Sequence, residues 1–120
     1  MENIILLKHP KNWGLEKSVV LEQIKRALKT RKINNSEISL LFVGRKRAKD
    51  LNIKYRNKSY IPQVLGFPMK QDRDPDGMIR LGDIVVCTQK LKYEAVLKQK
   101  TIKEVLGEWL LHGVDNLLIQ

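Results

Sequence analysis

Cysteine, histidine and aromatic side chains are scarce in this chain of 120 residues. The single cysteine, Cys87, excludes an internal disulfide and fits a reducing compartment. The two histidines, His9 and His112, cannot by themselves build a metal site of three imidazoles. No apolar run is long enough to span a bilayer, and the run near the N-terminus is too short for a secretory signal. The sequence therefore predicts a cytoplasmic protein that has no membrane partner.

Positive charge, in contrast, is abundant. The formal net charge is +10 at pH 7 and the pI is about 9.9. Such a balance favours a polyanionic partner, with RNA or DNA as the first candidate, although a basic surface without a special role is the alternative. Seven cations gather in one segment, and such a cluster suits a phosphate backbone without reading its sequence. They are Arg45, Lys46, Arg47, Lys49, Lys54, Arg56 and Lys58.

The hydrophobic pattern predicts one α+β domain over residues 1–120. Apolar runs predict strands at residues 3–8, 38–43, 64–69 and 78–87. Helical spacing predicts helices at residues 15–29, 45–56, 88 to about 98, and 101–120. This order indicates a mixed four-stranded sheet with helices packed on it. The second helix is expected to turn Ala48, Leu51 and Tyr55 inward, so base stacking by Tyr55 or Tyr60 is a weaker interpretation than core packing.

The last predicted helix organises the rest of the chain. Thr101 and Glu104 form a capping-box pattern at its start. Its apolar residues recur at helical spacing, whereas Glu104, Glu108, His112 and Asn116 stand four apart and form a polar row on another face. The pattern predicts a helix that packs one side on the core and presents the other to a cleft. We expect His112 to lie there beside the strand at residues 78–87.

The acidic turn before that strand allows a second metal hypothesis. The segment DRDPDG at residues 72–77 matches the opening of a calcium loop, with Asp83 at the closing position. Predicted strands flank it, whereas an EF-hand requires helices. A solvated hairpin turn is therefore the preferred interpretation.

Five blocks, in this order, carry a resemblance to a known family. They are ISLLFV at residues 38–43, LNIKYRNK at 51–58, VLGFP at 64–68, LGDIVVC at 81–87 and LLHG at 110–113. Together they resemble the YbeY family, metal-dependent endoribonucleases of rRNA maturation and ribosome quality control. The resemblance implies a zincin-like metal-dependent hydrolase fold and a single-strand-specific endoribonuclease. It also implies RNA or the ribosome, and not DNA, as the partner.

The resemblance assigns roles to particular residues. Arg56 corresponds to a cleft arginine implicated in RNA binding or catalysis. His112 opens the zinc motif H-G-x-x-H-x-x-G-x-D-H, which implies catalysis and metal binding there. The motif's second histidine is Asn116 here, and its third falls past Gln120. Asparagine binds zinc poorly.

Other residues of the predicted site are less directly implied. Glu108 and Asp115 are the nearby carboxylates that would have to substitute as metal ligands. Zinc is therefore expected from the family but is predicted to bind weakly, and Asp83 is expected to play a structural role near the site. A catalytically impaired module that binds RNA or the ribosome through its basic surface is the alternative to an active nuclease.

Overall fold

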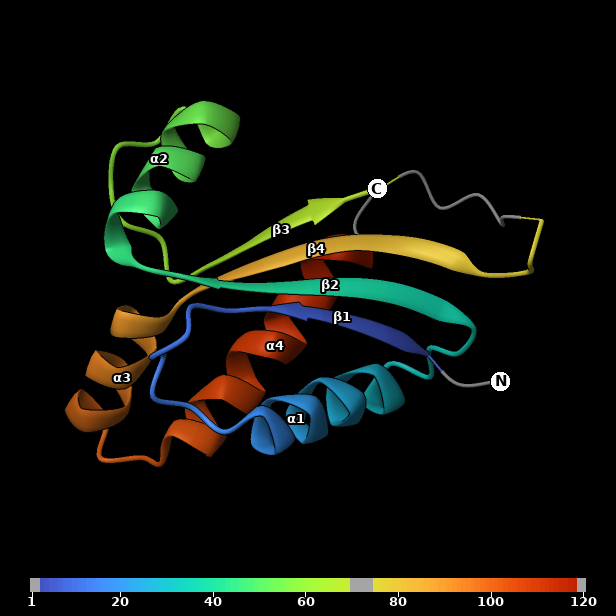
Figure 1. Ribbon diagram of the computed structural model, residues 1–120, viewed down its shortest axis with the longest axis horizontal. Coiled ribbons are helices and arrows are strands. Elements are labelled where there is room, and N and C mark those ends of the chain that lie inside the picture. The colour runs from blue at the N-terminus through green and yellow to red at the C-terminus, as the bar shows by residue number, and fades with distance from the viewer. Residues whose placement is uncertain (1–2, 70–74, 119–120) are drawn as a thin grey trace.

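The computed structural model describes residues 3–69 and 75–118, and these form four strands and four helices (Figure 1). Each corresponds to a predicted element with boundaries within about two residues. In chain order they are β1 Ile4–Lys8, α1 Lys17–Thr30, β2 Ser36–Val43, α2 Arg45–Arg56, β3 Val64–Pro68, β4 Ile79–Cys87, α3 Thr88–Leu97 and α4 Ile102–Leu118.

The strands form one mixed sheet in the order β1-β2-β4-β3. β1 pairs with β2 and β2 with β4 in parallel, whereas β3 is antiparallel to β4 and lies at an edge. The predicted mixed four-stranded α+β fold is therefore confirmed. Because β2 and β4 are parallel and in register at Val43 and Cys87, the helices that follow them, α2 and α3, begin at the same end of the sheet.

The helices are divided unequally between the two faces of the sheet (Figure 1). α1, α3 and α4 lie on one face, where the main core forms around fully buried residues such as Ile24, Phe42, Ile84 and Leu110. α2 lies on the other face over a smaller cluster of buried residues, which are Val43, Ala48, Leu65, Val85 and Cys87. Successive residues of β4 from Ile84 to Cys87 thus alternate between the two clusters, as the pleat of a strand requires.

The predicted start of the last helix is confirmed. Thr101 Oγ1 accepts a hydrogen bond from the Glu104 amide at 3.1 Å, and Glu104 Oε1 accepts one from the Thr101 amide at 3.0 Å. This reciprocal pair satisfies two amides that would otherwise lack partners at the helix start. Leu106, Leu110 and Leu117 are fully buried, so the apolar side of α4 packs on the core as expected.

Tyr55 does not face the core, and that expectation is wrong. Its side chain is 57% exposed, and its ring packs edge-on against Phe67 with 5.3 Å between ring centroids. Only Ala48 and Asn52 of α2 are buried, because the helix rests on the sheet along a narrow stripe. Tyr60 is 53% exposed as well, so burial no longer argues against base stacking by either tyrosine.

The turn before β4 contains part of the calcium-loop pattern. Asp72 and Asp74 lie outside the described residues. Asp76 Oδ1 accepts a hydrogen bond from the Met78 amide at 2.9 Å, and Gly77 adopts a φ of 84° that favours glycine. These features are those of an Asx-type turn leading into β4. Within residues 3–69 and 75–118, no helix is long and apolar enough to cross a membrane.

Candidate functional site

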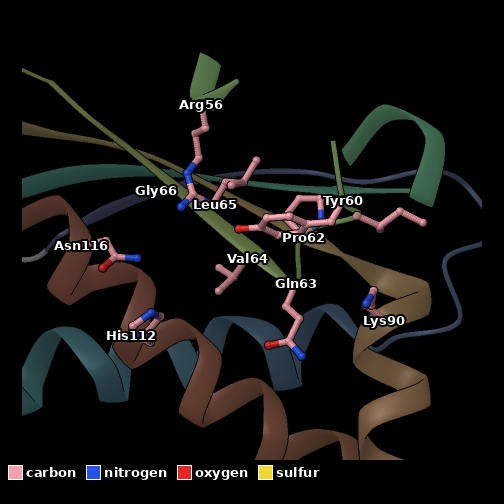
Figure 2. A pocket seen from close by; sticks show the side chains of 11 residues that line it. Arg56, Tyr60, Pro62, Gln63, Val64, Leu65, Gly66, Lys90, His112 and Asn116 are labelled. Atoms are coloured by element: carbon pink, nitrogen blue, oxygen red, sulfur yellow. The ribbon is translucent and has the colours of Figure 1, made fainter. Parts of the chain in front are cut away.

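A cleft of about 710 Å³ opens between α4, the edge strand β3 and the segment that follows α2 (Figure 2). Glycine brings α4 close to the sheet here. A Cβ on Gly66 would come within 3.1 Å of Asn116 Cβ, and one on Gly113 within 3.0 Å of the Ile84 side chain. The cleft is lined by Arg56, Tyr60, Ile61, Pro62, Gln63, Val64, Leu65, Gly66, Lys90, His112 and Asn116.

The structure brings three of the predicted site residues to this cleft. His112 and Asn116 line it from successive turns of α4, and Arg56 reaches it from the end of α2 on the opposite side (Figure 2). The next residue on α4, Gly113, packs on Ile84 of β4, whereas His112 itself lines the cleft together with residues of β3. His112 forms no hydrogen bond with another residue in the described part of the chain.

A buried asparagine, Asn52, connects two residues that line the cleft, Arg56 and Tyr60. Asn52 is 0% exposed, and its Oδ1 accepts a hydrogen bond from Arg56 Nη1 at 3.4 Å. Its Nδ2 donates to the Tyr60 carbonyl at 3.0 Å. One amide therefore positions both the guanidinium and the segment that bears Tyr60.

The two carboxylates near His112 on α4, those of Asp115 and Glu108, form ion pairs with Arg31 and Lys100, which do not line the cleft. Arg31 donates to both oxygens of Asp115, at 2.6 and 2.9 Å, and this hydrogen bonding lowers the pKa of Asp115. Lys100 donates to Glu108 at 2.7 Å and lowers the pKa of Glu108 in the same way. Both groups stay ionised at neutral pH, and neither is among the residues that line the cleft.

The cleft does not match the zinc site that the resemblance implies. Its candidate ligands are one imidazole, His112, and one amide, Asn116, whereas a catalytic zinc normally has three protein ligands. Nowhere in residues 3–69 and 75–118 do three or more His, Cys, Asp or Glu side chains gather so that they could hold a metal ion. The described residues therefore do not fit a complete zinc site.

Asp83 lies on the other side of the sheet from His112. It lines a separate groove of about 460 Å³ together with Leu6, Leu41, Tyr55 and Phe67. Its neighbour Ile84 points toward α4 and Gly113, so the pleat directs Asp83 the opposite way. The structure thus does not bring Asp83 together with the cleft residues.

The seven cations of the segment from Arg45 to Lys58 share one electrostatic feature. None of them forms an ion pair with a carboxylate in the described part of the chain, although six other cations do. Those six are Arg26, Arg31, Arg80, Lys98, Lys100 and Lys103. α2 begins with three consecutive cations, Arg45 to Arg47, which oppose the positive end of its helix dipole. The charge at the start of α2 therefore lacks ion-pair partners among the described residues and is not placed for helix stability, whereas Lys54 and Arg56 lie in the last turn, where cations favour the helix dipole.

Three cleft features were not assigned from the sequence. Lys90 comes from α3, Gln63 precedes β3, and Asn52 supports Arg56 from below. Of these three, only Asn52 could have been recognised in the sequence. It stands four residues before Arg56, so the two side chains lie on the same side of a helix. Lys90 and Gln63 reach the same cleft through the pairing of β3 with β4. The Cys87 amide donates to the Gln63 carbonyl at 3.0 Å, and Lys90 follows Cys87 by three residues.

These observations define an α+β domain whose basic cleft lies between a sheet edge and a histidine-bearing helix. A family model described as "Endoribonuclease YbeY" matches residues 10–118. The chain belongs to the YbeY family. The segments that it shares with that model include α2, β3, α3 and α4, each of which contributes to the lining of the cleft.

Individual relatives agree with this membership. The chain is 37% identical over 81 residues to the endoribonuclease YbeY of Thermodesulfovibrio yellowstonii, covering 68% of this chain and 50% of that protein. It is 34% identical over 114 residues to the one of Bartonella quintana, covering 88% of this chain and 71% of the relative. The chain thus spans from about half to about seven tenths of the length of these relatives.

A solved structure has the same fold. The solution structure of TM1509 from Thermotoga maritima matches 95% of this chain and 71% of its own, with a TM-score of 0.62 and 23% sequence identity. At that identity the likeness concerns the arrangement of the strands and helices.

The zinc content of the purified protein tests whether the cleft lacks a complete zinc site. We expect the purified protein to hold well under one zinc per molecule, because His112 is the only imidazole in the cleft. Elemental analysis by mass spectrometry measures this, with His112→Ala as the test variant and His9→Ala as its control. One tightly held zinc that His112→Ala removes and His9→Ala keeps would contradict the expectation and return Glu108 or Asp115 as ligands.

Proposed function

We propose that this chain binds single-stranded RNA in the cleft and acts as a YbeY-type endoribonuclease in rRNA maturation and ribosome quality control. The observation that supports RNA binding best is the set of unpaired cations on α2 beside a cleft lined by Arg56 and Lys90. None of the described residues that line the cleft is a carboxylate, so none of them repels a phosphate. The cytoplasm, where ribosomes mature, is the compartment that this function requires.

Arg56 is the residue that we assign to the phosphate. Its guanidinium can hold two phosphate oxygens at once, and it can oppose the negative charge that develops during phosphoryl transfer. Asn52 restrains it from below. The cations of α2, and Lys58 just after it, then bind neighbouring phosphates without reading the bases. They are Arg45, Lys46, Arg47, Lys49, Lys54 and Lys58.

His112 faces the same cleft from the opposite wall and is the proposed catalytic and metal-binding partner of Arg56. Phosphodiester hydrolysis in this family is expected to be metal-assisted, with Asn116 beside His112 as a weak oxygen ligand. Since the described residues do not complete such a site, the role that we derive from their geometry is the binding and orientation of RNA.

A second candidate function is a catalytically impaired module that binds RNA or the ribosome. The ion pairs of Glu108 and Asp115 favour it, because both carboxylates bind cations and neither lines the cleft beside His112. Cleavage of a fluorescently labelled single-stranded RNA, with zinc or manganese added and with Arg56→Ala as the comparison, separates the two. Cleavage that Arg56→Ala abolishes supports the nuclease, and binding without cleavage supports the module.

RNA binding itself is tested by its response to salt. We expect the affinity of the parent protein for single-stranded RNA to fall steeply as salt rises, because lysines and arginines release the counterions of the phosphates. A filter-binding titration at several salt concentrations gives the slope, about 0.7 per phosphate contact for a single strand. Affinity that does not respond to salt would contradict the proposed function.

A further inference from the structure

The cleft extends beyond the residues that the family motifs place there. Arg56, His112 and Asn116 lie toward one end of it, whereas Lys90 and Gln63 line the other end, near the start of α3 (Figure 2). We call this second part, formed by Tyr60, Gln63 and Lys90, the Lys90 end. The volume of the cleft, about 710 Å³, is more than one phosphate group occupies, so the Lys90 end has room for a further part of a ligand.

Tyr60 offers an aromatic face that is exposed but held in place. Its side chain is 53% exposed, and in Figure 2 its ring lies between Arg56 and Lys90. Its backbone is anchored, because the Tyr60 carbonyl accepts a hydrogen bond from the buried Asn52 amide at 3.0 Å. An exposed aromatic ring on an anchored backbone is the arrangement on which unpaired bases stack in single-strand-binding proteins.

Lys90 provides a cation at the same end. It is half-buried, yet it forms no ion pair or hydrogen bond with another described residue. Its side chain lines the cleft with no carboxylate of the described residues paired to it, so the ammonium is available to an anionic ligand. Lys90 also lies near the basic start of α2, because its neighbour Gln89 accepts a hydrogen bond at Oε1 from the Arg45 amide at 3.3 Å.

The edge of β3 connects the two ends of the cleft. Gln63 and Met69 direct their backbone groups toward β4, where they pair with Cys87 and Leu81. Antiparallel strands alternate in this respect, so Val64 and Gly66 direct their amides away from β4, to the open edge. Both residues line the cleft. A strand of RNA that follows this edge would meet backbone N–H donors between Arg56 and Lys90.

We propose that the Lys90 end is a nucleotide subsite, in which Tyr60 stacks on an unpaired base and Lys90 binds an adjacent phosphate. The proposal rests on the proposed function, since it concerns the nucleotide that lies beyond the phosphate at Arg56. It gives a physical basis for the single-strand binding already proposed, because only an unpaired base exposes a face to the ring.

Fluorescence anisotropy with a labelled oligouridylate tests the subsite. Tyr60→Ala is expected to weaken binding roughly tenfold without changing the salt slope, because stacking releases no counterions. Tyr60→Phe should bind like the parent, since it keeps the ring. Lys90→Gln should lower the salt slope by about 0.7, the value for one phosphate contact. Inorganic polyphosphate, which has no bases, should bind equally to Tyr60→Ala and the parent.

Two residues of α3 that lie outside the cleft serve as matched controls. Tyr93 is exposed and does not line the cleft, and the Lys92 side chain lies over Gly14. Tyr93→Ala and Lys92→Gln should bind like the parent. If Tyr60→Ala and Lys90→Gln match these controls while Arg56→Ala weakens binding, the subsite is overturned and the proposed function stands. If the parent itself shows no salt-dependent binding, both proposals are overturned.

Discussion

Alanine at Arg45, Arg47 and Lys49 together is expected to weaken RNA binding roughly 10- to 100-fold near physiological salt and to lower the salt slope by about two units. The three side chains are exposed and lack ion-pair partners in the described part of the chain, so their charge is available to phosphates. Each lost phosphate contact removes about 0.7 from the slope for a single strand. All RNA sequences should be affected by a similar factor, because backbone contacts do not read bases.

A second triple variant controls for net charge. Lys17, Lys25 and Lys29 are exposed on α1, which lies on the opposite face of the sheet from α2 (Figure 1). Their replacement by alanine changes the net charge by the same amount and should reduce binding much less. If both triple variants lose affinity equally, diffuse charge and not the α2 surface attracts the RNA. If neither does, the basic surface serves only solubility.

Single variants in the cleft refine this result. Arg56→Ala should cost more affinity than alanine at any one of the three α2 positions, because Arg56 lines the cleft and the others lie outside its lining. His112→Ala should leave binding nearly unchanged, since its proposed role is to hold a metal and not a phosphate. The reverse order, with His112 dominant, would indicate that the imidazole itself contacts the RNA.

Asn52→Leu is expected to lower the free energy of unfolding by about 1–3 kcal/mol, the range for buried polar groups that lose a hydrogen-bond partner. The variant leaves the Tyr60 carbonyl without its donor and Arg56 without its acceptor. Because Asn52 and Ala48 are the only buried residues of α2, the loss should also loosen this helix on the sheet. Urea unfolding gives the stability, and hydrogen exchange of the α2 amides gives the local effect.

The RNA affinity of the Asn52→Leu variant shows whether Asn52 positions Arg56 or only stabilises the fold. Asn52→Leu should bind RNA more weakly while folded, and combining it with Arg56→Ala should cost less than the sum of the two single effects. Ile53→Ala, at an exposed position of the same helix, is the control and should change stability by less than about 0.5 kcal/mol. An Asn52→Leu protein as stable as that control would show that the buried amide contributes nothing.

The element pattern could be predicted because it depends on local and periodic properties of the chain. Short apolar runs marked the strands, and the capping box at Thr101 and Glu104 marked the start of α4 within one residue. The mixed sheet also followed, since a hairpin connects β3 to β4 whereas helices separate the other strands. These features need no knowledge of distant contacts.

The candidate site was predictable only in part. His112, Asn116 and Arg56 were identified from motif blocks, and the structure brings them to one cleft. Tyr55 was expected in the core, but α2 buries only a narrow stripe and leaves the ring at the surface. Helical periodicity gives the face on which a residue lies, but it does not give the width of the surface that covers that face.

The sequence by itself determined the elements, the basic charge and the shortage of histidine, since these are properties of composition and local spacing. Tertiary structure alone decided which charges are available. The pairing of Arg31 with Asp115 joins residues 84 positions apart and engages a carboxylate that lies three residues after His112 on α4. The approach of α3 to β3 likewise adds Lys90 to the cleft. Such contacts depend on how helices pack across the sheet, and no local pattern along the chain encodes that geometry.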